Sequence, residues 1–144
     1  MPGILCHTDN LMIDGNASVP KASEVYPCNF YDSLVTYNAP DYIVINYGVN
    51  DYKYDAEIFT SNYLELLKVI RKRCPLSKIF ILPCFRGDHF EVLKNFIDEY
   101  NKDYNDNLQF INSSGWVPKD PLHPLREAHK KIAEKLTAEL KKLL

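Results

Sequence analysis

Two residues in the C-terminal third of the chain have the types and spacing of a general base and the group that orients it. Asp120 and His123 lie three positions apart in the segment Asp-Pro-Leu-His-Pro, just before a long amphipathic stretch. A carboxylate that accepts a hydrogen bond from one imidazole nitrogen fixes the tautomer and leaves the other nitrogen free as a base. On spacing alone, a turn capped by Asp120 with His123 at the surface is an equally good interpretation.

A second polar group follows an apolar run in the middle of the chain. Gly48-Val49-Asn50-Asp51 comes directly after residues 42–47, and its glycine permits a tight exit from a strand. The side-chain amide of Asn50 is a donor of the kind that stabilises an oxyanion, and removing such a donor costs about 2.7–4 kcal/mol. Taken alone, the segment is more typical of an ordinary Gly-Asn-Asp turn.

The segments that must position these groups alternate between two kinds. Continuous apolar runs, typical of strands covered on both faces in parallel sheets, occur at residues 42–47, 78–83 and 108–112. Apolar residues recur at helical spacing in residues 58–73, 90–100 and 125–144. The alternation predicts right-handed crossovers and an α/β fold, a three-layer α/β/α sandwich around a flavodoxin-like parallel sheet of four or five strands.

The remaining elements are expected in the N-terminal part of the chain. Residues 3–7 and 11–13 are short apolar runs that would supply further strands, and residues 30–37 have the composition of a short helix. No linker is long enough to separate a second domain, so residues 1–144 are expected to form one domain.

Ligands of open parallel sheets bind outside the carboxyl ends of the strands. This rule selects three loops as functional, at residues 48–51, 84–89 and 113–123. Asn50 lies in the first loop, and Asp120 and His123 lie in the third, so we expect them to face one cleft. Trp116, also in the third loop, is a candidate for stacking on a substrate ring or for anchoring its loop to the body of the protein.

Both polar segments resemble sequence blocks of the SGNH hydrolases, also called GDSL esterases and lipases. Gly48-Val49-Asn50-Asp51 is similar to the family's Gly-x-Asn-Asp block, and Asp120-Pro121-Leu122-His123 is similar to its Asp-x-x-His block. The resemblance covers about residues 40–144. It implies that Asn50 donates to the oxyanion, with His123 as the base and Asp120 as its orienting group. The family's second oxyanion donor is a backbone N–H at a glycine, for which Gly15 is the best match.

The serine nucleophile of that family is not recognisable. The nearest counterpart of its Gly-Asp-Ser-Leu block is Thr8-Asp9-Asn10-Leu11, where an asparagine replaces the serine, and an amide is not a nucleophile for acyl transfer. The short stretch before Gly48 favours a domain that is truncated or divergent at its N-terminus. Five other side chains could replace this serine, but none is favoured by its position in the sequence, so the nucleophile is unknown. They are Ser18, Ser23, Ser113, Ser114 and Cys84.

Composition excludes several classes of function. The 144 residues are 46% hydrophobic and 25% charged with a net charge of −2, which argues against disorder and against nucleic acid as the main partner. No apolar stretch is long enough for a membrane span. The four cysteines form no CxxC pair, and His89 and His129 lack partners at ligand spacing, so no metal is expected. Without a basic leader segment, a cytoplasmic location is the default expectation.

The resemblance implies an ester hydrolase for a small acyl ester or an O-acetylated carbohydrate, with no cofactor. The alternative is a catalytically inactive SGNH-like fragment or binding domain that lacks the serine nucleophile. A flavodoxin-like signalling or nucleotide-binding domain is a third interpretation, but no glycine-rich phosphate loop supports it. A chain without its first strand would expose a sheet edge, which predicts a tendency to form homodimers.

Overall fold

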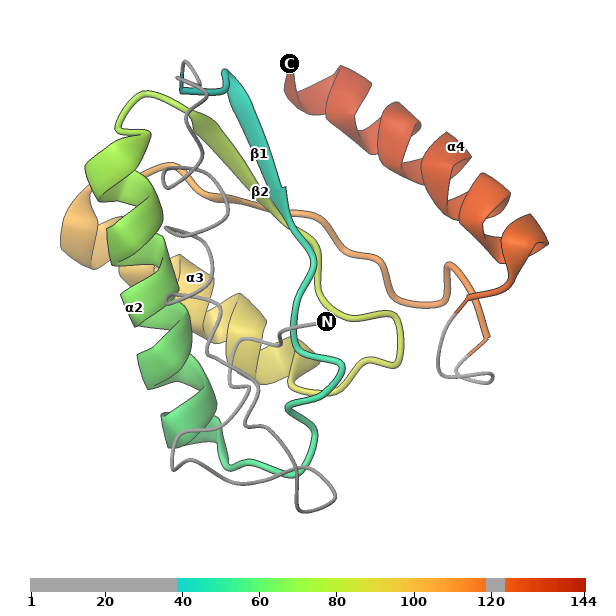
Figure 1. Cartoon of the computed structure of the whole chain (residues 1–144), viewed down its shortest axis with the longest axis horizontal. Helices are drawn as coiled ribbons and strands as arrows, with labels where there is room; N and C mark the ends of the chain where they lie inside the picture. Colours follow the sequence, from blue (N-terminus) through green and yellow to red (C-terminus); the bar gives the residue numbers. More distant parts are fainter. Residues whose placement is uncertain (1–38, 119–123) are drawn as a thin grey trace, which may run out of the picture.

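The computed structural model describes residues 39–118 and 124–144, in which strands and helices alternate (Figure 1). The elements are β1 (Tyr42–Ile45), α2 (Ala56–Arg73), β2 (Lys78–Ile81), α3 (Phe90–Tyr104), β3 (Gln109–Phe110) and α4 (Arg126–Leu143). The predicted order of strands and helices is therefore confirmed over this part of the chain. The strands expected at residues 3–7 and 11–13 and the helix expected at 30–37 lie outside the described residues.

The three strands form one parallel sheet in the order β1-β2-β3. Ile45 is the register partner of Ile81, and Ile81 is in turn the partner of Phe110. One further bond extends each pair, since Leu82 N donates to Ile45 O at 2.8 Å and Ile111 N donates to Ile81 O at 2.9 Å. The described residues thus hold three of the four or five predicted strands.

Side chains alternate between the two faces of the sheet, and each face is covered by helices. The face of β1 and β2 that carries Ile45 and Ile81 packs in one core with buried residues of α2 and α3. Phe80 and Leu82 belong to a second cluster, covered by Leu136 and Leu140 of α4. Figure 1 shows α2 and α3 on one side of the strands and α4 on the other. The described part therefore has three layers.

Helix ends follow the signals in the sequence. Asp55 caps α2, because its carboxylate accepts a hydrogen bond from Ile58 N at 2.9 Å, and basic residues fill the last turn of this helix. The helix expected over residues 125–144 corresponds to α4, which begins at Arg126 and ends at Leu143. Leu143, at the end of this helix, is 38% exposed.

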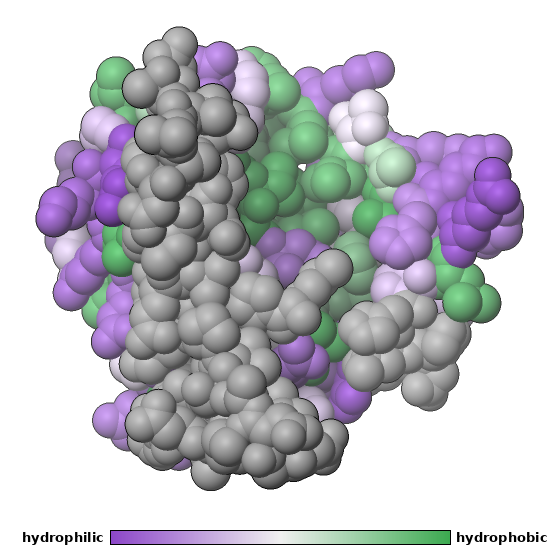
Figure 2. Space-filling model, viewed as in Figure 1, coloured by the Kyte–Doolittle hydropathy of each residue, from purple (hydrophilic) through white to green (hydrophobic). Residues whose placement is uncertain are grey.

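The first strand is only partly covered on the α4 side. Tyr42 and Val44 are 54% and 43% exposed, because α4 packs over the cluster of Phe80, Leu82 and Ile111 instead. Figure 2 shows this apolar surface between β1 and α4. Such a surface would be available for the predicted homodimer. The homodimer itself stays a prediction.

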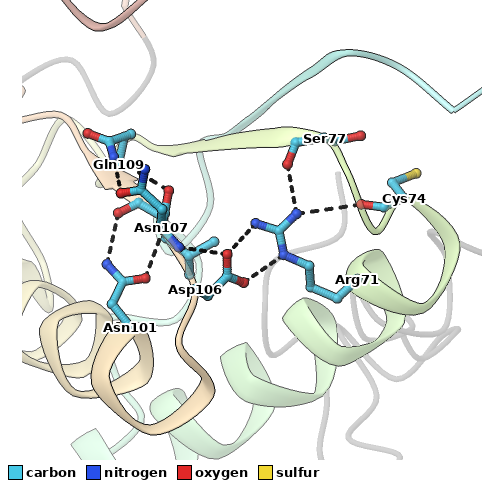
Figure 3. A network of polar contacts seen from close by, with 8 residues as sticks. Arg71, Cys74, Ser77, Asn101, Asp106, Asn107 and Gln109 are labelled. Atoms are coloured by element: carbon cyan, nitrogen blue, oxygen red, sulfur yellow. Dashed lines mark hydrogen bonds and ion pairs between the residues drawn. The ribbon is translucent and has the colours of Figure 1, made fainter.

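A polar network joins the amino ends of β2 and β3 (Figure 3). The Arg71 guanidinium contacts both carboxylate oxygens of Asp106 at 2.6 and 2.7 Å and donates to Ser77 O at 2.7 Å. Asn101 exchanges two hydrogen bonds with the backbone of Leu108, at 2.8 and 3.0 Å. These contacts fix the approaches to both strands, at the edge of the sheet opposite the loops that follow the strands.

Candidate active site

Three loops leave the carboxyl ends of the strands and are tied to one another. They are the first loop (residues 46–55), the second loop (82–89) and the third loop (111–118). The Asn46 side chain donates to Leu82 O at 2.9 Å and to Pro83 O at 3.0 Å. The Ser113 hydroxyl donates to the same Pro83 O at 3.1 Å. The topological rule thus selected loops that do meet at one edge of the sheet.

The Asn50 segment is a tight turn with its asparagine at the surface. Asp51 N donates to Gly48 O at 3.2 Å, and Gly48 has a φ of +116°, which a residue with a side chain rarely adopts. Asn50 is exposed, whereas Asp51 is fully buried and accepts a hydrogen bond from Tyr54 N at 3.0 Å. The turn interpretation is therefore correct, and the turn leaves residue Asn50 exposed. The oxyanion role of Asn50 stays a prediction.

The second loop braces this turn. His89 Nε2 donates to Asp51 O at 2.9 Å, and its ring stacks on Phe59 with centroids 4.4 Å apart. Arg86 lies over the ring of Tyr52 at 4.9 Å. His89 is the N-cap residue of α3, and its half-buried side chain makes no capping hydrogen bond but contacts the first loop instead. Sequence reasoning missed this contact, although the position of His89 in a selected loop pointed toward the site.

Two of the substitute nucleophiles are unsuited to attack. Ser113 is 2% exposed and its hydroxyl is engaged with Pro83 O, so it acts as a structural residue. Cys84 is buried, and burial together with the nearby Asp88 carboxylate raises the pKa of its thiol. Ser114 is exposed, but Ser18 and Ser23 lie outside the described residues. The nucleophile is therefore still unassigned.

Trp116 anchors the third loop to the sheet. The half-buried indole packs against Phe80, Leu82 and Ile111, and Trp116 N donates to Ser113 O at 3.2 Å. These contacts support the anchoring interpretation, and stacking of Trp116 on a substrate ring stays a prediction. Between residues 84–91 and 114–117 the two loops leave a cavity of about 480 Å³, with Phe85, Phe90, Arg86 and Glu91 in its lining.

Only part of the predicted constellation falls within the described residues. Asn50 and Trp116 lie on loops of the same sheet edge, whereas Asp120, His123 and Gly15 are outside the described ranges. The approach of His123 to Asn50 therefore stays a prediction. Among residues 39–118 and 124–144, no group of histidine, cysteine and acidic side chains is arranged to hold a metal ion. None of the described helices is both long and apolar enough to cross a membrane.

Comparisons with known proteins point to esterases. No model of a known protein family matches the chain. It is 27% identical, over 147 aligned positions, to the cellulase/esterase CelE of Acetivibrio thermocellus, covering 90% of this chain and 18% of CelE. A family two carbohydrate esterase from Clostridium thermocellum, solved in complex with cellohexaose, superposes with a TM-score of 0.72 at 22% identity, over 98% of this chain and 47% of the esterase. An active-site mutant of such an esterase from the same organism gives the same TM-score and identity.

The chain spans about half the length of these solved esterases and less than a fifth of CelE. At 22% identity the superposition concerns the arrangement of the backbone. The mixed α/β architecture, with a small parallel sheet and helices on both of its faces, is thus the fold that this chain has in common with the family two carbohydrate esterases.

Proposed function

We propose that this chain is a carboxylic ester hydrolase of the SGNH type that acts on carbohydrate esters. The observation that carries the proposal is the exposed Asn50 on a braced turn at the carboxyl edge of the sheet. This is where open parallel sheets bind ligands. The likeness to CelE and to the family two carbohydrate esterases supports ester hydrolysis and a carbohydrate as the alcohol part of the substrate.

In the proposed mechanism, Asp120 orients the imidazole of His123, which takes the proton of a hydroxyl nucleophile. The oxygen of that nucleophile attacks the ester carbonyl, and the oxyanion accepts hydrogen bonds from Asn50 and from a backbone N–H near Gly15. His123 then gives its proton to the sugar oxygen as the carbon–oxygen bond of the ester breaks, so the sugar leaves as an alcohol and an acyl-enzyme remains. A water molecule, deprotonated by His123, attacks this acyl group, releases the acid and restores the nucleophile.

The first experiment compares matched variants in the hydrolysis of p-nitrophenyl acetate and in acetate release from acetylated cellobiose. His123→Ala is expected to abolish turnover, whereas His129→Ala, which removes an exposed histidine of α4, should retain it. Asn50→Ala should lower kcat by about 10²–10³-fold, the usual effect of removing one oxyanion donor. Asn95→Ala on the exposed side of α3 is the control. Equal rates in His123→Ala and His129→Ala would refute the hydrolase.

The nucleophile can be found by covalent trapping. A fluorophosphonate forms a stable bond with an activated serine, and peptide mass spectrometry then locates the modified residue. In the unsubstituted chain we expect a single labelled serine. In His123→Ala this serine should stay unlabelled, because the base that activates it is missing. Ser113 should not be labelled, because it is buried and its hydroxyl is engaged. Labelling at Ser113 would show that the third loop rearranges and that Ser113 is not held in place by Pro83 O.

A second candidate function is carbohydrate binding without turnover. It is favoured by the absence of a Gly-Asp-Ser-Leu block and by the burial of Ser113 and Cys84. This candidate predicts that cellohexaose binds, as measured by calorimetry, while ester hydrolysis stays at the background rate in the unsubstituted chain. Turnover that is lost in His123→Ala excludes it.

A further inference from the structure

We propose that His89 is a positioning residue that holds the Asn50 turn in place through the carbonyl of Asp51. The inference deepens the proposed function, and its catalytic consequence rests on the oxyanion role of Asn50. His89 lies 39 positions after Asn50 in the sequence, on a different loop of the same sheet edge.

The first step is the contact itself. Asp51 closes the turn, since its N–H donates to Gly48 O at 3.2 Å, and its carbonyl accepts from Tyr54 N at 3.0 Å and from His89 Nε2 at 2.9 Å. A carbonyl oxygen only accepts hydrogen bonds, so Nε2 must carry the proton. The residue that follows Asn50 is thereby fixed by two donors, one local and one from the second loop.

The second step is the ring that supports His89. Phe59 of α2 is 1% exposed and stacks on the imidazole with centroids 4.4 Å apart and an interplanar angle of 12°. The same phenyl ring also lies against the start of the turn. A Cβ atom placed on Gly48 would be 3.5 Å from the Phe59 ring. Phe59 and His89 together therefore touch both ends of the turn that presents Asn50.

The third step is the backbone of His89, which is left-handed with φ 54° and ψ 19°. Residues that precede a helix normally have extended backbone, and side chains other than glycine rarely adopt positive φ. The other such residue among the described ones is Asn105, at the C-terminal end of α3, where left-handed backbone is common. Histidine tolerates this backbone better than most residues, and here the conformation accompanies the contact of its side chain with the neighbouring loop, which supports the positioning role.

The experiment separates the hydrogen bond from the stacking and from the strain. His89→Phe keeps an aromatic ring on Phe59 but removes the N–H donor. His89→Gly relieves the backbone and removes both contacts, and Asn105→Gly relieves the backbone at the far end of the same helix as its matched control. His89→Gln tests rescue, because it restores a side-chain N–H donor.

The first readout does not depend on activity. Amide hydrogen exchange of Asp51 and Tyr54, followed by NMR, should accelerate about two- to tenfold in His89→Phe and His89→Gly, the range expected for one lost hydrogen bond. The side-chain amide signal of Asn50 should shift in both variants. Asn105→Gly should leave all three probes unchanged. Unchanged exchange in His89→Phe would overturn the positioning role, whether or not the chain hydrolyses esters.

The second readout is the split between kcat and KM in ester hydrolysis. We expect His89→Phe to lower kcat about tenfold with KM within twofold, since a displaced oxyanion donor acts on the transition state. Rescue of kcat by His89→Gln supports the proposal, and loss of kcat in Asn105→Gly to the same extent would refute it. If the unsubstituted chain shows no turnover, the proposed hydrolase fails, while the exchange measurement still decides the role of His89.

Discussion

Replacing Asp106 by asparagine is expected to lower the free energy of unfolding by about 2 kcal/mol. The substitution keeps the shape of the side chain but removes the anionic partner that the Arg71 guanidinium contacts at 2.6 and 2.7 Å. An exposed ion pair contributes about 0–1 kcal/mol, whereas breaking a fully buried one costs about 3–5 kcal/mol. The two side chains are 20% and 16% exposed, so the loss falls between these limits.

The loss can be measured by urea unfolding, followed by circular dichroism and by the fluorescence of Trp116, the single tryptophan of the chain. A loss of about 2 kcal/mol corresponds to a fall in Tm of about 6–8 °C for a domain of this size. The control is Asp98→Asn, which breaks the pair with Lys94 at 2.8 Å, where the side chains are 45% and 53% exposed. This change should cost much less stability than Asp106→Asn, because water screens an exposed ion pair.

Equal losses in the two variants would refute the argument, because the buried and the exposed pair would then contribute alike. Arg71→Lys provides a second test. A single ammonium cannot reproduce the two contacts with Asp106 and the bond to Ser77 O, so most of the stabilisation should still be lost. Neither Asp106→Asn nor Arg71→Lys should change kcat below the unfolding temperature, since the pair lies at the opposite edge of the sheet.

Three further predictions concern the core and the turn. Tyr63→Phe should raise the free energy of unfolding by about 1–3 kcal/mol in chemical denaturation, because the fully buried Tyr63 hydroxyl has no hydrogen-bond partner within the described residues; a loss of stability would disprove this. Gly48→Ala should cost more than about 1 kcal/mol, since alanine is strained at a φ of +116°, and an unchanged Tm would contradict it. The free energy of unfolding should fall above about pH 9. Burial raises the pKa values of Cys84, Tyr63 and Tyr100, so the unfolded chain releases these protons at lower pH than the folded chain and is favoured as the pH rises. Cys84→Ala should weaken this pH dependence, as followed by urea midpoints between pH 7 and 10.

The strands could be predicted because their apolar runs are continuous and bounded by turn residues, although only β2 is buried over most of its length and β1 is partly exposed. The ends were harder to predict. Helix α3 was expected to reach Tyr100 and continues to Tyr104, whose ring stacks on that of Tyr100 at 4.5 Å. The residues between them are polar, so the hydrophobic period gave no sign of the last turn.

The site was predictable as far as topology determines it. Parallel strands bring their carboxyl ends to one edge, which is why the loops that carry Asn50 and Trp116 lie at the same edge of the sheet, as expected. The contact between His89 and Asp51 joins residues 38 positions apart and depends on a left-handed backbone that the sequence pattern does not specify. The same applies to Arg71 and Asp106, which are 35 positions apart. Pairings of this kind follow from the assembled fold.

Pro83 ends the ladder of backbone hydrogen bonds between β2 and β3. After Ile111 N donates to Ile81 O, the parallel pattern would next require an N–H at position 83, and proline has none. Beyond this point the two strands are no longer paired, and the Ser113 hydroxyl and the Asn46 side-chain amide both donate hydrogen bonds to Pro83 O. The cavity of about 480 Å³ opens between the loops that follow. An imino acid at this position therefore marks the point from which the two loops that line the cavity run as separate segments.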